Sequence, residues 1–179
     1  NKIFCIGQNK TGTTSIEAAL QGFGYKMGNQ EQGELLLKAW YQRDFKKIIK
    51  FCKTAQAFQD IPFSLPYTYQ HLDQAYPEAK FILTERDSAE QWYLSLTKFH
   101  SKLWADGNRL PKMFDLKSVE GRYKDFAYQY MKFNFQTLNS DLYNKEVLRN
   151  HYLTQNEAVK TYFKSRPEKL LVINVSESD

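Results

Sequence analysis

A glycine-containing turn near the start of the chain constrains its fold most strongly. The turn runs from Gly7 to Ser15 and separates an apolar run, Ile3–Ile6, from a helical run, Ile16–Leu20. A strand, a tight turn and a helix in this order direct backbone N–H groups and the positive end of the helix dipole toward one point. The sequence therefore predicts a strand-turn-helix unit that binds a phosphate group.

The lysine of this turn stands in an unusual place. A Walker A loop, G-x-x-x-x-G-K-[ST], has its lysine directly after the second glycine, where it reaches the outer phosphates of a nucleoside triphosphate. This chain keeps both glycines, Gly7 and Gly12, but it has Thr13 at the lysine position and Lys10 two residues before the second glycine. We therefore expect Lys10 to approach the phosphate from the other side.

The displaced pattern K-[ST]-G-T-T resembles the 5′-phosphosulfate loop of sulfotransferases that use 3′-phosphoadenylyl sulfate (PAPS). Residues 81–96, FILTERDSAEQWYLSL, resemble the second signature of that family, in which a strand ends in Arg and the next helix carries Ser. Two further stretches, residues 60–62 before 75–80 and residues 170–175, look like the bacterial-type branch. The resemblance covers most of the chain, and its first two motifs are the specific ones.

The resemblance implies a cradle for the 5′-phosphate of the donor. Its residues are Lys10, Thr11, Gly12, Thr13, Thr14 and Ser15. The glycine lets the backbone approach, the hydroxyls donate hydrogen bonds and the lysine supplies positive charge. Lys10 has a second implied role, which is to stabilise the charge that builds on the bridging oxygen as the sulfuryl group leaves. The alternative is an ordinary strand-to-helix turn with surface hydroxyls.

Arg86 and Ser95 are the implied ligands of the 3′-phosphate. Arg86 follows an apolar run, and a guanidinium at the end of a parallel strand faces the ligand crevice and binds phosphate oxygens bidentately. Ser95 lies nine residues beyond Arg86, one more than the usual spacing in the family. The alternatives are a surface ion pair of Arg86 with Asp87 or Glu90, and a helix cap for the nearby Ser88.

Asp60 is the candidate general base, because Asp60-Ile61-Pro62 lies where many sulfotransferases have His-Leu-Pro. A carboxylate can accept the acceptor's proton if burial raises its pKa toward the working pH. Alternatively, Asp60 caps the turn into Pro62. The other candidate bases are His71, His100 and His151, and His100 is the best of these because it lies on the predicted helix that follows Arg86.

Two further regions bear on the acceptor and the adenine. Residues 104–118 read as a loop or lid. An aromatic series with helical spacing lines an acceptor pocket, stacks on adenine or, as we favour, packs in the core. It consists of Tyr123, Phe126, Tyr130 and Phe133. We assign no role to Gln155, where the related branch commonly has His, and we find no late nucleotide-binding loop before Asp179.

Alternating apolar runs and helical periods predict an α/β fold with three layers, a mainly parallel sheet flanked by helices as in P-loop NTPase-like sulfotransferases. The expected strands are residues 3–6, 55–60, 80–85 and 170–175. The expected helices cover residues 16–22, 32–53, 67–75, 88–103 and 145–165. A length of 179 residues suits one domain over 1–179, and the start at Asn1 and the end at Asp179 leave open that further residues belong to the protein.

The composition of the chain limits the kinds of partner and compartment that we expect. The net charge of +5 comes from scattered basic residues, so we expect no nucleic-acid partner. Cys5 and Cys52 have neither the number nor the spacing of a disulfide framework or a zinc site. No apolar run approaches the roughly 20 residues that cross a bilayer, and no signal peptide is seen, so we expect a cytoplasmic protein without a membrane partner.

The predicted function is transfer of a sulfuryl group from PAPS to a hydroxyl or amine of a small-molecule or glycan acceptor. It needs no metal and releases 3′-phosphoadenosine 5′-phosphate (PAP). Two alternatives stay open: a small-molecule kinase that uses ATP and Mg²⁺ on the same fold, and a PAP-binding module without turnover. Thr13 at the Walker lysine position speaks against the kinase.

Overall fold

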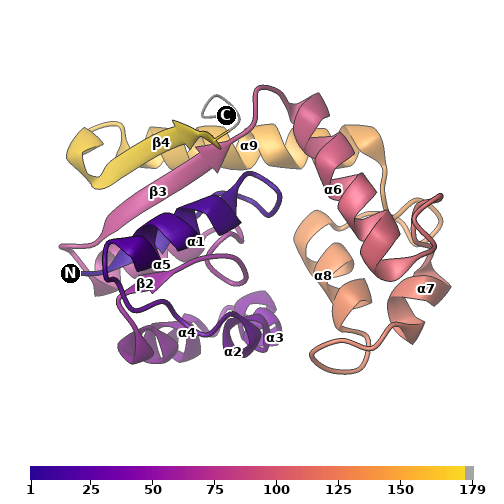
Figure 1. The fold of residues 1–179 in the computed structure, drawn as a ribbon, viewed down its shortest axis with the longest axis horizontal. Coiled ribbons are helices and arrows are strands. Elements are labelled where there is room, and N and C mark those ends of the chain that lie inside the picture. Colours follow the sequence, from indigo (N-terminus) through magenta and orange to yellow (C-terminus); the bar gives the residue numbers. More distant parts are fainter. Residues whose placement is uncertain (176–179) are drawn as a thin grey trace. The chain divides into compact units, whose positions relative to one another are not determined.

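A four-stranded parallel sheet organises the chain (Figure 1). Its strands are β1 (Ile3–Cys5), β2 (Ala57–Phe58), β3 (Lys80–Glu85) and β4 (Leu170–Asn174), in the order β2-β1-β3-β4. Each neighbouring pair is parallel. The structure, a computed structural model, describes residues 1–175. It confirms the predicted fold class, a mixed α/β fold in which helices flank a parallel sheet.

The chain divides into two compact units. The first comprises Asn1–Asp87 together with the chain from Gln155 onward, and the second comprises residues 88–154. The sheet lies entirely within the first unit. The prediction of a single domain over residues 1–179 is not tested by this division and stays a prediction.

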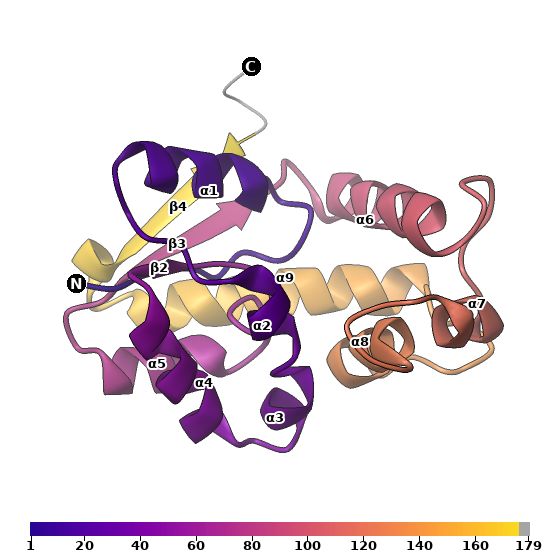
Figure 2. The same ribbon diagram turned by 60° about the horizontal axis from the view of Figure 1, so that its bottom comes forward.

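Five helices of the first unit connect its strands. They are α1 (Thr13–Gly22), α2 (Gln30–Glu34), α3 (Leu37–Tyr41), α4 (Phe45–Phe51) and α5 (Thr68–Ala75). Two 3₁₀ turns, Cys52–Thr54 and Pro167–Lys169, and the end of α9 (Lys145–Phe163) complete the unit. Figure 2 shows α1 on one side of the sheet and α4 and α5 on the other.

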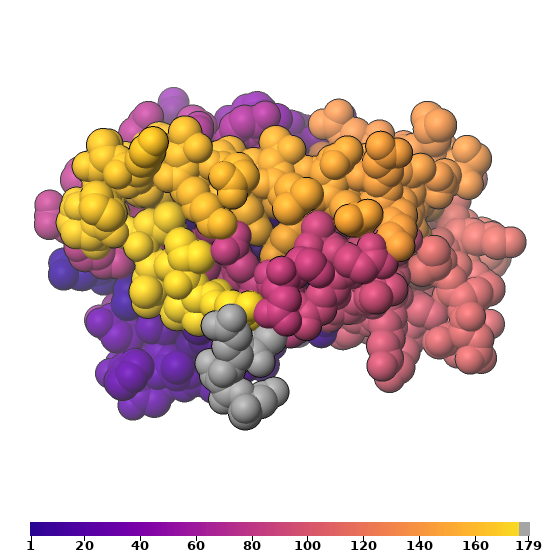
Figure 3. Space-filling model, turned by 90° about the horizontal axis from the view of Figure 1, so that it is seen from above, coloured from indigo at the N-terminus to yellow at the C-terminus, as the bar shows by residue number. Residues whose placement is uncertain are grey.

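Aromatic side chains fill the core beneath the sheet. Phe4 of β1 is fully buried, and its ring centroid lies 5.7 Å from that of Phe58, 5.8 Å from that of Phe63 and 5.6 Å from that of Phe81. Phe163 of α9 packs on Phe81 at 4.8 Å. At the sheet edge, by contrast, β4 exposes apolar side chains, and Figure 3 shows this strand on the molecular surface.

The predicted helix over residues 32–53 is wrong in its continuity, because three short helices replace it. The last break comes at Arg43, which has a left-handed backbone with a φ of 62°. Its guanidinium lies 5.2 Å from the ring of Trp40 and 4.9 Å from that of Tyr67. The predicted strand over 55–60 is also shorter than expected, because only Ala57 and Phe58 pair with β1.

The second unit is helical and has an aromatic core of its own. It contains α6 (Ala89–Trp104), α7 (Met113–Ser118), α8 (Phe126–Phe135) and the beginning of α9. The hydroxyl of Ser88 accepts a hydrogen bond from the Gln91 N–H at 3.1 Å, which confirms Ser88 as the cap of α6. Trp92 stacks on Tyr152 with ring centroids 4.8 Å apart. Phe99 and Leu103 of α6 are 41% and 50% exposed.

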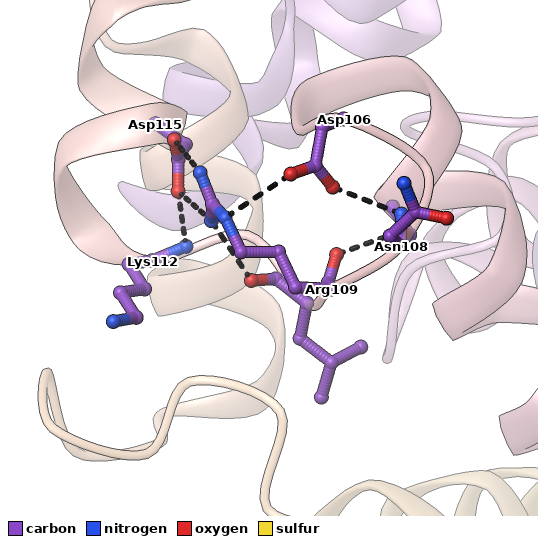
Figure 4. A network of polar contacts seen from close by, with 7 residues as sticks. Asp106, Asn108, Arg109, Lys112 and Asp115 are labelled. Carbon is purple, nitrogen blue, oxygen red and sulfur yellow. Dashed lines mark hydrogen bonds and ion pairs between the residues drawn. The ribbon is translucent and has the colours of Figure 1, made fainter.

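The predicted loop over residues 104–118 is partly wrong, because residues 113–118 form α7. A polar network orders the approach to this helix (Figure 4). The Arg109 guanidinium donates to both carboxylate oxygens of Asp115, at 2.7 and 2.8 Å, and lies 3.7 Å from Asp106. Asp115 also accepts from the Lys112 N–H at 2.7 Å. The hydrogen bonds from Arg109 hold the pKa of Asp115 well below its usual range, so the pair stays ionised.

Candidate functional site

The carboxyl ends of the strands gather most of the predicted site residues at one edge of the sheet. Because all strands are parallel, the loop Gly7–Gly12 after β1, Asp60 after β2, Arg86 after β3 and Val175 after β4 leave the sheet at the same edge. The chain order reverses between β1 and β3. In doubly wound sheets ligands bind in the crevice at such a reversal.

The loop Gly7–Gly12 packs closely against Val175 at the start of α1. Gly12 has a φ of 93°, and a Cβ there would lie 2.8 Å from the Cβ of Val175, so only glycine fits. Lys10 also has a left-handed backbone, with a φ of 70°. In the part of the chain that the structure describes, no side chain caps α1, and its first turn holds no acidic residue. Such a helix start suits an anion.

Thr11 anchors the loop to β3. Its buried hydroxyl donates to the Gln8 carbonyl at 2.5 Å and lies 2.5 Å from the hydroxyl of Thr84. A Cβ on Gly7 would lie 2.0 Å from the same Thr84 oxygen, so the loop backbone is pressed against β3. The Thr11 hydroxyl is thus engaged within the protein, and a contact of this residue with a phosphate would come from its backbone N–H.

The remaining loop residues occupy the first turn of α1. Thr13 is buried, whereas Thr14 and Ser15 are exposed. Backbone N–H groups at this turn and the exposed hydroxyls are the donors that a phosphate requires. Their roles in binding stay predictions, but the fold places them at the carboxyl edge of the sheet.

Arg86 is joined to the loop by a hydrogen bond. Its Nε donates to the carbonyl oxygen of Lys10 at 2.7 Å, and both side chains are half-buried. The two acidic residues considered as surface partners of Arg86 make further polar contacts. Asp87 accepts from the Asn174 amide at 2.5 Å, and Glu90 pairs with Lys145 at 2.7 Å. Lys10 and Arg86 are thus two cationic residues on adjacent segments, which follow the neighbouring strands β1 and β3.

Asp60 lies two residues after the end of β2 and has a left-handed backbone, with a φ of 61°. One carboxylate oxygen accepts from the Ile61 N–H at 2.8 Å, and the other accepts from the Gln30 amide at 2.9 Å. Burial, followed by the negative charge of Glu34, raises the pKa of Asp60 to about 6, although hydrogen bonds from Ile61 and Asn9 oppose the rise. A carboxylate with this pKa can accept a proton near neutral pH.

The histidines occupy other surroundings. His71 on α5 stacks on Phe45 with ring centroids 3.7 Å apart. His100 is buried in the second unit, where its Nδ1 lies 3.1 Å from the Tyr143 hydroxyl. His151, also in the second unit, packs its ring 4.8 Å from that of Phe135. All three lie on helices, whereas Asp60 lies two residues after the end of β2.

Some predicted site residues lie in the second unit or outside the described residues. Ser95 is half-buried on α6 in the second unit, so its pairing with Arg86 stays a prediction. Phe126 and Tyr130 of the aromatic series are buried in the second unit, consistent with core packing, while Tyr123 and Phe133 are half-buried. The expected adenine-binding loop would follow β4 and lies outside the described residues.

Three polar residues near Asp60 were missed from the sequence. Asn9 hydrogen-bonds to the Asp60 carboxylate, the Ser64 hydroxyl donates to Asn9 at 3.2 Å, and the buried Gln155 amide donates to the Ser64 carbonyl at 2.7 Å. The only signal for Asn9 was its place inside the phosphate loop. Gln155 gave a weaker signal, since the related branch commonly has His at its position.

The structure also bears on the cysteines, on metal binding and on membrane-spanning helices. Cys5 and Cys52 are buried free thiols, and burial raises the pKa of each to about 12. Over residues 1–175, no three His, Cys, Asp or Glu side chains cluster as metal ligands would. None of the described helices combines the length and apolar character that crossing a bilayer requires.

The comparison with known families places the chain among proteins of one activity class. A family model described as a sulfotransferase domain matches residues 2–178. No curated protein gives a significant match to the chain. The match spans both units and both motifs, the loop Gly7–Gly12 with the start of α1 and the strand that ends before Arg86.

Proposed function

Because the chain belongs to the sulfotransferase family, we propose that it transfers a sulfuryl group from PAPS to a hydroxyl or amine of an acceptor. The observation that carries the proposal is the joining of Arg86 to the phosphate loop through the Lys10 carbonyl. PAPS differs from ATP in carrying a 3′-phosphate. A second cation fixed beside the loop that would hold the 5′-phosphate gives a physical reason for preferring such a nucleotide.

The residues at the start of α1 fit the 5′-phosphosulfate end of the donor. The helix N-terminus, Thr13, Thr14 and Ser15 offer N–H and hydroxyl donors. Lys10 adds the positive charge. Arg86 would bind the 3′-phosphate, with Ser95 as its proposed partner.

Asp60 would act as the general base. When bound, PAPS supplies the sulfuryl group, and PAP leaves with the electron pair of the broken sulfur–oxygen bond. The acceptor oxygen or nitrogen forms the new bond to sulfur, and Asp60 takes the proton that this atom loses. Lys10 stabilises the negative charge on the departing oxygen. No metal is needed in this scheme, and the small-molecule or glycan acceptor and the cytoplasmic location stay predictions.

The proposal is tested by incubating the chain with radiolabelled PAPS and a panel of hydroxyl and amine acceptors. We expect transfer by the parent chain and a loss of roughly 10²–10⁴-fold in kcat for Asp60→Asn. The matched control is Asp106→Asn, an exposed aspartate of the second unit. PAP binding without transfer to any acceptor would favour the binding module, and Mg²⁺-dependent binding of ATP in preference to PAP would favour the kinase.

A further inference from the structure

Hydrogen bonds connect the phosphate loop to Asp60 through a side chain that has no role in the reaction described above. The Ser64 hydroxyl donates to Oδ1 of Asn9 at 3.2 Å, and the Asn9 side chain also hydrogen-bonds to Asp60. An amide has one accepting oxygen and one donating nitrogen. Because the oxygen of Asn9 accepts from Ser64, the NH₂ group is the end that donates to the Asp60 carboxylate.

Ser64 is held firmly enough to fix this orientation. Its N–H donates to the carbonyl oxygen of Asp60 at 2.9 Å, which closes the turn from Asp60 to Ser64. Its own carbonyl accepts from the Gln155 amide at 2.7 Å. Ser64 and Gln155 are 4% and 7% exposed, so water competes little for these hydrogen bonds. Ser64 is therefore fixed through its N–H, its carbonyl and its hydroxyl.

We propose that Asn9 is a positioning residue for Asp60, and that Ser64, anchored by Gln155, sets the orientation of the Asn9 amide. The inference rests on the proposed function, in which Asp60 is the base. Asn9 belongs to the loop that would hold the donor. Asn9 therefore links the donor-binding loop to the Asp60 carboxylate, which would receive the acceptor's proton.

The charges around Asp60 make this donor important. Glu34 on α2, Glu17 on α1 and the Cys5 thiol on β1 face the Asp60 carboxyl group. Burial and the two glutamates raise the pKa of Asp60, and the hydrogen bonds from Ile61 and Asn9 lower it. Removing the Asn9 donor leaves the raising influences in place, so the pKa of Asp60 would rise further and the carboxylate would lose one of the groups that orient it.

The test is an NMR titration of the Asp60 carboxyl carbon in the full chain, with the resonance assigned by its loss in Asp60→Asn. The variants are Asn9→Ala and Ser64→Ala, and the matched control is Ser165→Ala, at an exposed serine. We expect the pKa of Asp60 to rise by about half a pH unit or more in both variants and to stay unchanged in the control. The proposal is overturned if the pKa of Asp60 is unchanged in Asn9→Ala. If Asn9→Ala does not fold, an unchanged pKa of Asp60 in Ser64→Ala overturns it.

The pH profile of sulfuryl transfer distinguishes a positioning role of Asn9 from a purely structural one, because loss of a structural contact alone would not shift this profile. In Ser64→Ala we expect the acidic limb of the kcat profile to shift to higher pH together with the pKa of Asp60, while KM for PAPS changes less than twofold. A lower kcat with an unshifted limb would overturn the positioning role. The titration requires no turnover, so a parent chain that titrates as expected but transfers nothing would refute the proposed function separately.

Discussion

Replacing Asp60 by asparagine is expected to stabilise the protein at neutral pH while removing its proposed base. In the folded chain the pKa of Asp60 is raised from 3.8 to about 6, first by burial and then by Glu34. The folded state therefore binds a proton more tightly than the unfolded state between these two values. The ionised carboxylate lowers the free energy of unfolding increasingly from pH 3.8 to about 6, and by a constant amount above that.

The size of the effect follows from this difference in pKa. From 3.8 to about 6 is about 2.2 pH units, and at about 1.36 kcal/mol per unit the cost of ionising Asp60 reaches ~3 kcal/mol. Asparagine carries no charge and avoids this cost. Its NH₂ group cannot accept the hydrogen bond from Gln30, which offsets ~1 kcal/mol. We expect Asp60→Asn to be more stable than the parent by roughly 1–3 kcal/mol at about pH 7.5.

Urea denaturation followed by circular dichroism measures this difference. The parent and Asp60→Asn are compared at about pH 4 and about pH 7.5, and Asp106→Asn gives the baseline for removing an exposed aspartate. The advantage of Asp60→Asn should be largest at the higher pH and should shrink toward pH 4. An advantage of equal size at both values, or a variant less stable than the parent at pH 7.5, would refute the reasoning.

Two further substitutions test the packing of the first unit by the same denaturation assay. Gly7→Ala places a Cβ 2.0 Å from Oγ1 of Thr84 and should cost more than ~2 kcal/mol, whereas Gly22→Ala, with no atom within 4 Å, should change the stability by less than ~1 kcal/mol. Equal midpoints would contradict the contact between the loop and β3. Asp73→Asn removes a buried carboxylate that accepts from Lys169 and Arg166, and should cost roughly 3–5 kcal/mol at neutral pH. Burial raises the pKa of Asp73, but the hydrogen bonds from Lys169 and Arg166 outweigh burial and lower it. The stabilisation should therefore be lost only as the pH falls through the lowered pKa. A cost under ~1 kcal/mol at neutral pH would contradict the account.

The elements that the sequence predicted best are those whose signals are local. The strand Lys80–Glu85 matches the expected residues because a short apolar run lies between Pro77 and Asp87. The cap of α6 at Ser88 was likewise predicted from residues that are neighbours in the chain. By contrast, Arg43 at the helix break has a left-handed backbone, and its guanidinium packs on the ring of Tyr67, which is distant in the sequence. Helical periodicity alone could not reveal it.

The site divides in the same way. The loop with Lys10, Arg86 and Asp60 follow three strands, and parallel topology is enough to bring such positions to one edge. The residues around Asp60 could not be predicted, because the Gln155 amide reaches the Ser64 carbonyl across a separation of 91 residues. Their contacts depend on the packing of α9 against the turn after β2. Hydrogen-bond partners of this kind leave no periodic pattern in a sequence.

The preference of the phosphate loop and Arg86 for a 3′-phosphorylated nucleotide is the central claim, and calorimetry tests it most directly. PAP and ADP are titrated into the chain, into Arg86→Ala and into the control Arg122→Ala, which changes an exposed arginine of the second unit. We predict tighter binding of PAP than of ADP, with the preference lost in Arg86→Ala by roughly tenfold or more and retained in the control. Equal binding of the two nucleotides by the parent chain, or tighter binding of ADP, would contradict the account and move the kinase alternative to first place.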